Sequence, residues 1–151
     1  MGTFKSAEEI YAFAIREEEK AATLYTDLAN QAKQQHIKEM FLEFAAQERG
    51  HKEILIRAQQ SGGLRPSAKD IADLGIAELM EEVEMSPDLD YQHVLQFAMQ
   101  REMAAYDMYS ALAEIAPSQK LRQTLEALGQ EEAKHKLRIE TEYDQLVLTE
   151  N

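Results

Sequence analysis

Apolar residues recur every three or four positions along four long stretches of this 151-residue chain. This period predicts amphipathic helices, each with one inward-facing side. Ser6 and Glu9 form a capping-box pattern that starts the first helix, and the glycines after Ser61 end the second. The predicted inner positions are, helix by helix, Ile10, Phe13, Ala14, Glu18, Ala21, Tyr25, Leu28 and Ala29; Ile37, Phe41, Phe44, Ala45, Glu48, His51, Ile54 and Leu55; Val94, Phe97, Ala98, Glu102, Ala105, Tyr109, Leu112 and Ala113; and Leu121, Leu125, Leu128, Glu132, His135 and Ile139.

Turn signals divide the chain into two helix hairpins, at about 6–60 and 90–148, within one all-α domain covering 1–151. Polar residues 30–35 and Pro117-Ser118 mark the two turns, and Asp90 is a good N-cap for the third helix. Segment 61–89 is far longer than usual between bundle helices, so we expect a four-helix bundle with a long crossover that leaves the second and third helices parallel. We expect a short helix in this crossover, from Ser67 to about Glu84.

The two hairpins repeat one another at a fixed offset of 84 residues. Each half carries a lone Glu on its first helix and a Glu-x-x-His pair on its second. These polar residues are Glu18, Glu48 and His51 in the first half and Glu102, Glu132 and His135 in the second. The offset also matches Tyr25 with Tyr109. Internal duplication explains this pattern better than chance and predicts two similar hairpins that pack face to face about an approximate two-fold axis.

All six groups can lie at one level of the bundle, because each lies about 14–18 residues from its hairpin turn, and a helix rises ~1.5 Å per residue. Four carboxylates in an apolar interior would cost several kcal/mol each. Two divalent ions would neutralise them, and carboxylate and imidazole ligands suit iron or manganese. A single Glu-x-x-His pair is often an exposed helix face, whereas two matched pairs predict a metal site. His36 and His93 have no such match and are expected on the surface.

The amino-acid composition limits the possible partners, chemistry and location of the protein. The net charge of −12 argues against nucleic acid or anionic membrane as a partner. The absence of cysteine excludes disulfides, thiolate metal sites and cysteine nucleophiles. No apolar run is long enough to span a membrane, and no signal-peptide core follows Met1, so we expect a cytoplasmic protein.

At these residues the chain resembles the ferritin-like superfamily, most closely the rubrerythrin-type domain. The motif is Glu-x6-Tyr followed by Glu-x-x-His, present twice, over about residues 6 to 145. The resemblance implies a di-iron centre with the six Glu and His residues as ligands and Glu48 and Glu132 as bridges between the ions. It also implies that Tyr25 and Tyr109 donate hydrogen bonds to ligand carboxylates, and that ferrous iron reacts with hydrogen peroxide or dioxygen.

Two departures from the family pattern qualify these expectations. Rubrerythrins usually have a further Glu three residues after the third-helix ligand, where this chain has Ala105. A redox-linked exchange of ligands is therefore not expected, and the six-ligand set is closer to that of bacterioferritin. The chain also lacks the four cysteines of a rubredoxin module, so a separate protein would have to deliver electrons.

Three possible functions remain open from the sequence. The first is an oxidoreductase in which two ferrous ions reduce peroxide or dioxygen. The second is a ferroxidase that oxidises ferrous iron for storage or sequestration. Many cage-forming ferritins add a fifth helix, for which the C-terminus has no room, so a homodimer is expected rather than a large shell. Manganese or a mixed pair would use the same ligands, and a structural or metal-responsive module is a third possibility.

Overall fold

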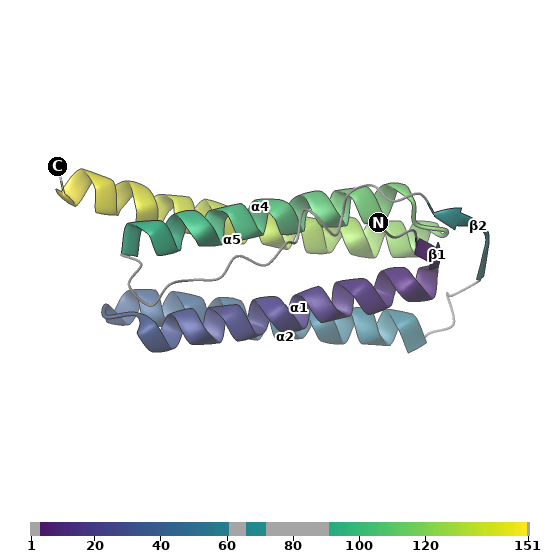
Figure 1. Ribbon diagram of the computed structural model, residues 1–151, viewed down its shortest axis with the longest axis horizontal. Helices are drawn as coiled ribbons and strands as arrows, with labels where there is room; N and C mark the ends of the chain where they lie inside the picture. Colours follow the sequence, from purple (N-terminus) through teal and green to yellow (C-terminus); the bar gives the residue numbers. More distant parts are fainter. Residues whose placement is uncertain (1–3, 61–65, 72–90, 151) are drawn as a thin grey trace. The chain divides into compact units, whose positions relative to one another are not determined.

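The computed structural model describes residues 4–60, 66–71 and 91–150. This part of the chain contains four helices and one small sheet (Figure 1). The chain divides into two compact units, Thr3–Ala72 and Asp73–Asn151 together with Met1–Gly2, and each unit holds one helix hairpin.

The first unit is built on helices α1, Ala7–Gln31, and α2, Gln35–Gln60. The two helices pack against each other as a hairpin with a short turn, as expected from the polar residues at this point. The Oγ of Ser6 accepts a hydrogen bond of 3.3 Å from the backbone N–H of Glu9, which confirms the predicted cap of the first helix.

Two short strands complete this unit and correct one prediction. Strands β1, Phe4–Ser6, and β2, Pro66–Ile71, pair antiparallel with an irregular register. The crossover helix predicted from Ser67 is therefore wrong over residues 67–71, where the backbone pairs with the N-terminal strand instead of forming helical hydrogen bonds. The remainder of that predicted helix, 72–84, lies outside the described residues.

The second unit is the hairpin of α4, Tyr91–Glu114, and α5, Gln119–Glu150. The Oγ of Ser118 accepts a hydrogen bond of 3.1 Å from the backbone N–H of Leu121 at the start of α5. The Nε of Arg122 donates a bond of 3.2 Å to the carbonyl of Ala113, which ties the end of α4 to α5. These contacts confirm the predicted turn; the proposed N-cap Asp90 lies outside the described residues.

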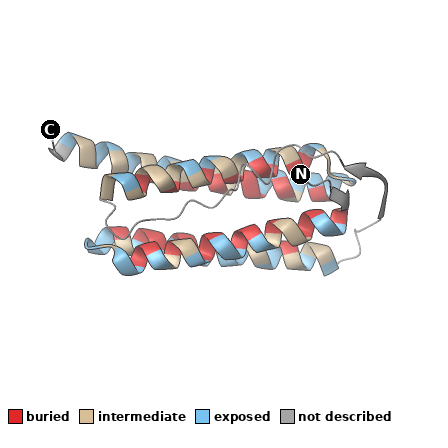
Figure 2. Ribbon diagram, in the orientation of Figure 1, coloured by how far each residue is buried: buried red, intermediate tan, exposed pale blue. Residues whose placement is uncertain are grey.

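Each helix buries one side, and on α5 the buried side ends at Ile139 (Figure 2). Most predicted inner residues are buried, including all of those on α5. Ile54 is a wrong prediction, since its side chain is 44% exposed on the flank of α2, while the neighbouring Leu55 takes the buried position. Phe13, Val94 and Phe97 are only partly buried. Further buried residues that the pattern did not assign are Ala7, Tyr11, Glu17, Ala22, Met40, Leu95, Met108 and Gly129.

His36 and His93 are both exposed, as predicted from the sequence. Among the helices described, none carries an apolar stretch long enough to cross a lipid bilayer.

Candidate metal centre

The first hairpin brings three predicted ligands together. Glu18 comes from the buried side of α1, and Glu48 and His51 lie one turn apart on the buried side of α2. The Nδ1 of His51 is 3.5 Å from Oε2 of Glu18 and 3.7 Å from Oε1 of Glu48. We call these three residues the first triad.

The second hairpin has the same three residue types at nearly the same distances. The Nδ1 of His135 on α5 is 3.5 Å from Oε1 of Glu102 on α4 and 3.8 Å from Oε2 of Glu132 on α5. We call these the second triad. The sequence repeat thus produces the same local arrangement of two carboxylates and one imidazole in both units.

Both triads have the donor atoms and the burial that a metal ion requires. The six side chains belong to residues that are between 1% and 6% exposed. Within each triad, one ligand atom from each residue lies within 4.8 Å of the other two. Two ligands about 2.1 Å from a common ion would be about 3.0–3.4 Å apart at angles of 90–109°. The observed separations of 3.5–3.8 Å are of this order, so each triad is a buried Glu/His cluster able to hold a metal ion.

The electrostatics of a triad favour a cation. If both of its carboxylates are ionised, the first triad carries a net negative charge even with its imidazole protonated. A buried charge is costly unless it is paired or bound to a metal. Oxygen and imidazole nitrogen are donors that iron and manganese accept.

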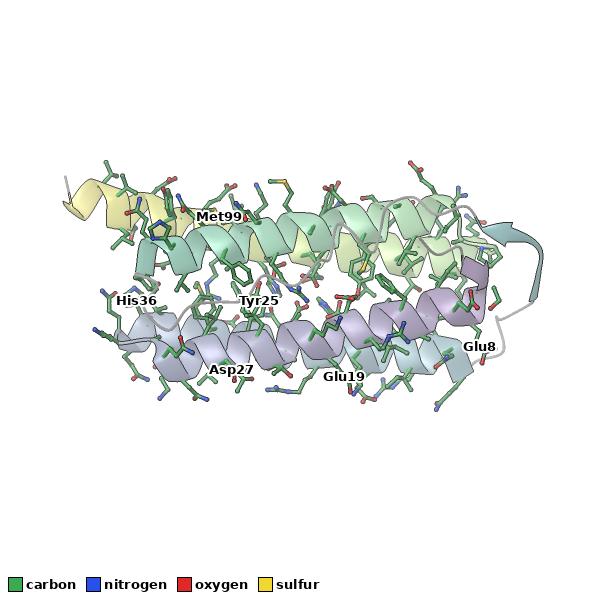
Figure 3. The ribbon with its side chains drawn as sticks, in the orientation of Figure 1. Glu8, Glu19, Tyr25, Asp27, His36 and Met99 are labelled. Carbon is green, nitrogen blue, oxygen red and sulfur yellow. The ribbon has the colours of Figure 1, made fainter. Side chains whose placement is uncertain are left out.

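The two tyrosines matched by the repeat are both fully buried, but their surroundings differ. Tyr25 lies on α1 (Figure 3), and its ring belongs to an aromatic cluster with two residues of α2. Its ring stacks on Phe41 with centroids 5.7 Å apart and meets Phe44 edge-on at 5.5 Å. At the positions matching the two phenylalanines the second hairpin has Leu125 and Leu128. The predicted hydrogen bonds from both tyrosines to ligand carboxylates stay predictions.

Sequence reasoning missed one buried carboxylate beside the first triad. Glu17 is 5% exposed, and its Oε1 lies 3.5 Å from the Nζ of Lys20. Its position continues the apolar series Ile10, Ala14 and Ala21 at three- and four-residue steps, which is the signal that could have identified it. At the matching position the second hairpin has Arg101, whose Nε and one Nη are buried. The repeat therefore reverses the charge of the residue that precedes each lone Glu ligand.

The repeat also breaks at the surface lysines. Lys52 on α2 forms an ion pair across the hairpin with Glu19 on α1. The matching Lys136 on α5 instead pairs with Glu140 of the same helix. The reason lies in α4, where Met103 occupies the position that corresponds to Glu19. Most of the residues that are identical at the 84-residue offset lie instead on the predicted inner sides of the helices.

The comparison with known families gives a direct result. The sequence profile of the family described as Rubrerythrin matches residues 9–143, which is most of the chain. The chain belongs to the rubrerythrin family. The match spans both hairpins and therefore both triads, so the predicted family is confirmed.

Solved structures agree with the fold of this rubrerythrin-family chain. A Thermotoga maritima protein, described as a candidate ferritin-like diiron-carboxylate protein, is 22% identical with a TM-score of 0.76, over 95% of this chain and 98% of that one. A hypothetical protein of Pyrococcus furiosus is 21% identical with a TM-score of 0.69, over 93% of this chain and 89% of that one. The predicted ferritin-like helical fold is confirmed. No curated protein gave a significant match.

Proposed function

We propose that the chain is a di-iron oxidoreductase that reduces hydrogen peroxide or dioxygen. The observation that carries this proposal is the paired triads, which offer four carboxylates and two imidazoles in the same local geometry within both hairpins. Membership of the rubrerythrin family supports it further. The proposed ligands are Glu18, Glu48, His51, Glu102, Glu132 and His135.

Charge balance supports a pair of divalent ions. Four carboxylates carry four negative charges, which two divalent ions would neutralise, and one ion would leave half of that charge in a buried environment. In this proposal Glu48 and Glu132 would serve as the bridging ligands of the pair, and each of the other four residues would hold one ion. Manganese or a mixed pair would satisfy the same donors.

The protein's own groups would fix the geometry of the reaction. The Glu-x-x-His spacing presents two donors from one helix face, and the lone Glu of each hairpin supplies the third. Tyr25 and Tyr109, as hydrogen-bond donors to carboxylates, would orient the ligands. When bound, two ferrous ions supply the electrons for the reduction.

The chain's departures from the family pattern shape the proposal. Because Ala105 replaces the additional Glu usual in rubrerythrins, we propose a centre that keeps its six ligands in both redox states. Because these 151 residues contain no cysteine, they hold no rubredoxin site, and we propose that a separate donor supplies the reducing electrons. We further propose that the protein is a cytoplasmic homodimer.

The second candidate is a ferroxidase, in which ferrous iron is the substrate and is passed on for storage or sequestration. The specific observation in its favour is again the six-ligand set without the additional Glu, which is closer to that of bacterioferritin. An acidic chain with a net charge of −12 would also attract ferrous cations.

Stopped-flow absorbance distinguishes the two functions. The diferrous protein would be mixed separately with peroxide and with dioxygen, and protein-bound metal counted afterwards. Fast oxidation by peroxide with two irons retained per chain would support the oxidoreductase. Oxidation of many irons per chain would support the ferroxidase. No reaction with either oxidant would contradict both.

A further inference from the structure

A hollow of about 390 Å³ opens on the surface of the second hairpin. It lies between α4 and α5, away from the residues of the second triad. Its walls combine one aromatic ring, several neutral hydrogen-bonding groups and one carboxylate. The residues that carry the argument are Tyr106, Ser110, Gln123, Glu126, Gly129 and Gln130.

The hollow depends on two residues that the first hairpin does not have. A Cβ atom at Gly129 would lie 3.3 Å from Cβ of Tyr109 and 3.8 Å from Cδ2 of Tyr106. The glycine therefore lets α5 approach both tyrosines closely. The first hairpin has Ala45 and Ala22 at the positions of Gly129 and Tyr106. Of the two hairpins, the second therefore is the one that places a tyrosine, Tyr106, beside a glycine, Gly129, at these positions.

The chemistry of the walls points to a neutral aromatic ligand with hydroxyl groups. The ring of Tyr106 can stack on another ring. The amides of Gln123 and Gln130 and the carboxylate of Glu126 can accept hydrogen bonds from hydroxyl groups. The lining residues include no Lys, Arg or His, which disfavours an anion. Glu126 is exposed, so solvent weakens its attraction for a cation.

We propose that this hollow binds a phenolic reductant of the hydroquinone class, which supplies electrons to the metal centre. The inference rests on the proposed oxidoreductase function. The balance is complete: hydroquinone loses two electrons and two protons to become the quinone, and one hydrogen peroxide takes up both and yields two molecules of water. Tyr106 is a positioning residue that holds the ring of the donor.

The position of the hollow suits this role. Tyr106 and Tyr109 lie on adjacent turns of α4 and approach the same point on Gly129. Tyr109 follows the proposed ligand Glu102 by two helical turns, and Glu132 lies one turn after Gly129. A donor stacked on Tyr106 is therefore separated from the second triad by a short, packed part of a single hairpin.

Binding is tested first with metal-free full-length protein, titrated with hydroquinone under anaerobic conditions and followed by NMR chemical shifts. We expect one saturable site with shifts centred on the lining residues. Tyr106→Leu should weaken binding about fivefold, which corresponds to ~1 kcal/mol for a lost aromatic pair. Glu126→Gln keeps an acceptor and should change affinity less than about twofold.

The matched control is Tyr143→Leu, which removes a tyrosine of the same hairpin whose hydroxyl accepts hydrogen bonds from Gln92 and Gln96, outside the hollow. Its affinity should equal that of the unmodified chain. The proposal is overturned if binding is not saturable, if Tyr106→Leu binds equally well, or if Glu126→Gln weakens binding more than Tyr106→Leu does.

A second readout separates this inference from the proposed function. Iron-loaded, reduced protein is oxidised by peroxide, and limiting hydroquinone is then added while absorbance reports re-reduction. Tyr106→Leu should leave the oxidation step unchanged and slow re-reduction about fivefold. Normal oxidation without any re-reduction contradicts the donor role alone. Absent oxidation contradicts the proposed function, while the metal-free titration still decides whether the hollow binds hydroquinone.

Discussion

Replacing Glu48 by Gln should stabilise the metal-free protein and remove its response to metal. Glu48 is 1% exposed and lies in the first triad, close to a second buried carboxylate, Glu18, and to His51. Because a buried carboxylate beside another carboxylate is costly to ionise, replacing Glu48 by a neutral group of the same shape should stabilise the metal-free protein by about 1–3 kcal/mol. The same change removes one proposed bridging ligand, so the affinity of the protein for metal should fall.

Urea unfolding followed by circular dichroism, with and without ferrous or manganous ions, measures both effects. A metal in 100-fold excess over its dissociation constant should stabilise the unmodified protein by about 2.7 kcal/mol, and Glu48→Gln should show little of this gain. Glu53→Gln is the matched control, because Glu53 is an exposed carboxylate on the same helix, and it should behave as the unmodified chain. The reasoning is refuted if metal-free Glu48→Gln is destabilised by more than about 1 kcal/mol, or if it keeps the full response to metal.

Three further predictions concern packing and pH. Gly129→Ala should destabilise the protein by about 1 kcal/mol, because the added Cβ would lie 3.3 Å from Cβ of Tyr109. Gly50→Ala should instead stabilise α2 by about 0.5–1 kcal/mol, because nothing lies within 4 Å of the added Cβ. Equal effects of the two substitutions in thermal unfolding would contradict this prediction. Phe44→Ala should cost about 3–5 kcal/mol by opening the aromatic cluster around Tyr25, and a loss below 1 kcal/mol in urea unfolding would mean that the cluster contributes little. Burial and the nearby charge of Glu142 raise the pKa of Tyr91. The stability of the protein should therefore fall as the pH rises above 10, because the tyrosine ionises first in the unfolded chain. The Tyr91→Phe variant should lose less stability than the unmodified protein between pH 9 and 11, and identical losses would argue against this cause.

The helices and the members of the triads were predictable because both depend on local periodicity. Ser6 caps α1 as expected, and the turn at Pro117-Ser118 joins α4 to α5. A three-residue spacing on a helix forces Glu48 and His51 onto one face, and the short turns then bring each lone Glu to the same height. The contact between each lone Glu and its His, 33 residues further along the chain, therefore follows from the short turn and the regular rise of two helices.

Features that depend on contacts distant in sequence could not be predicted in the same way. Residues 67–71 have a sequence compatible with a helix start, yet they pair with β1, more than 60 residues earlier in the chain. Ile54 and Leu55 are both apolar, and only the packing of α2 decides that Leu55 is the buried one. The close approach at Gly129, and with it the hollow beside Tyr106, depends on how tightly α4 and α5 pack.

The central claim is that the two triads together hold two metal ions. Anomalous diffraction from crystals of the iron-loaded protein, combined with metal analysis in solution, tests it most directly. The account predicts two iron atoms per chain, about 3.5–4 Å apart as in other two-metal sites, with Glu and His of both triads as ligands. One ion per chain, ions bound elsewhere, or two ions that each contact a single triad without a shared carboxylate would contradict it.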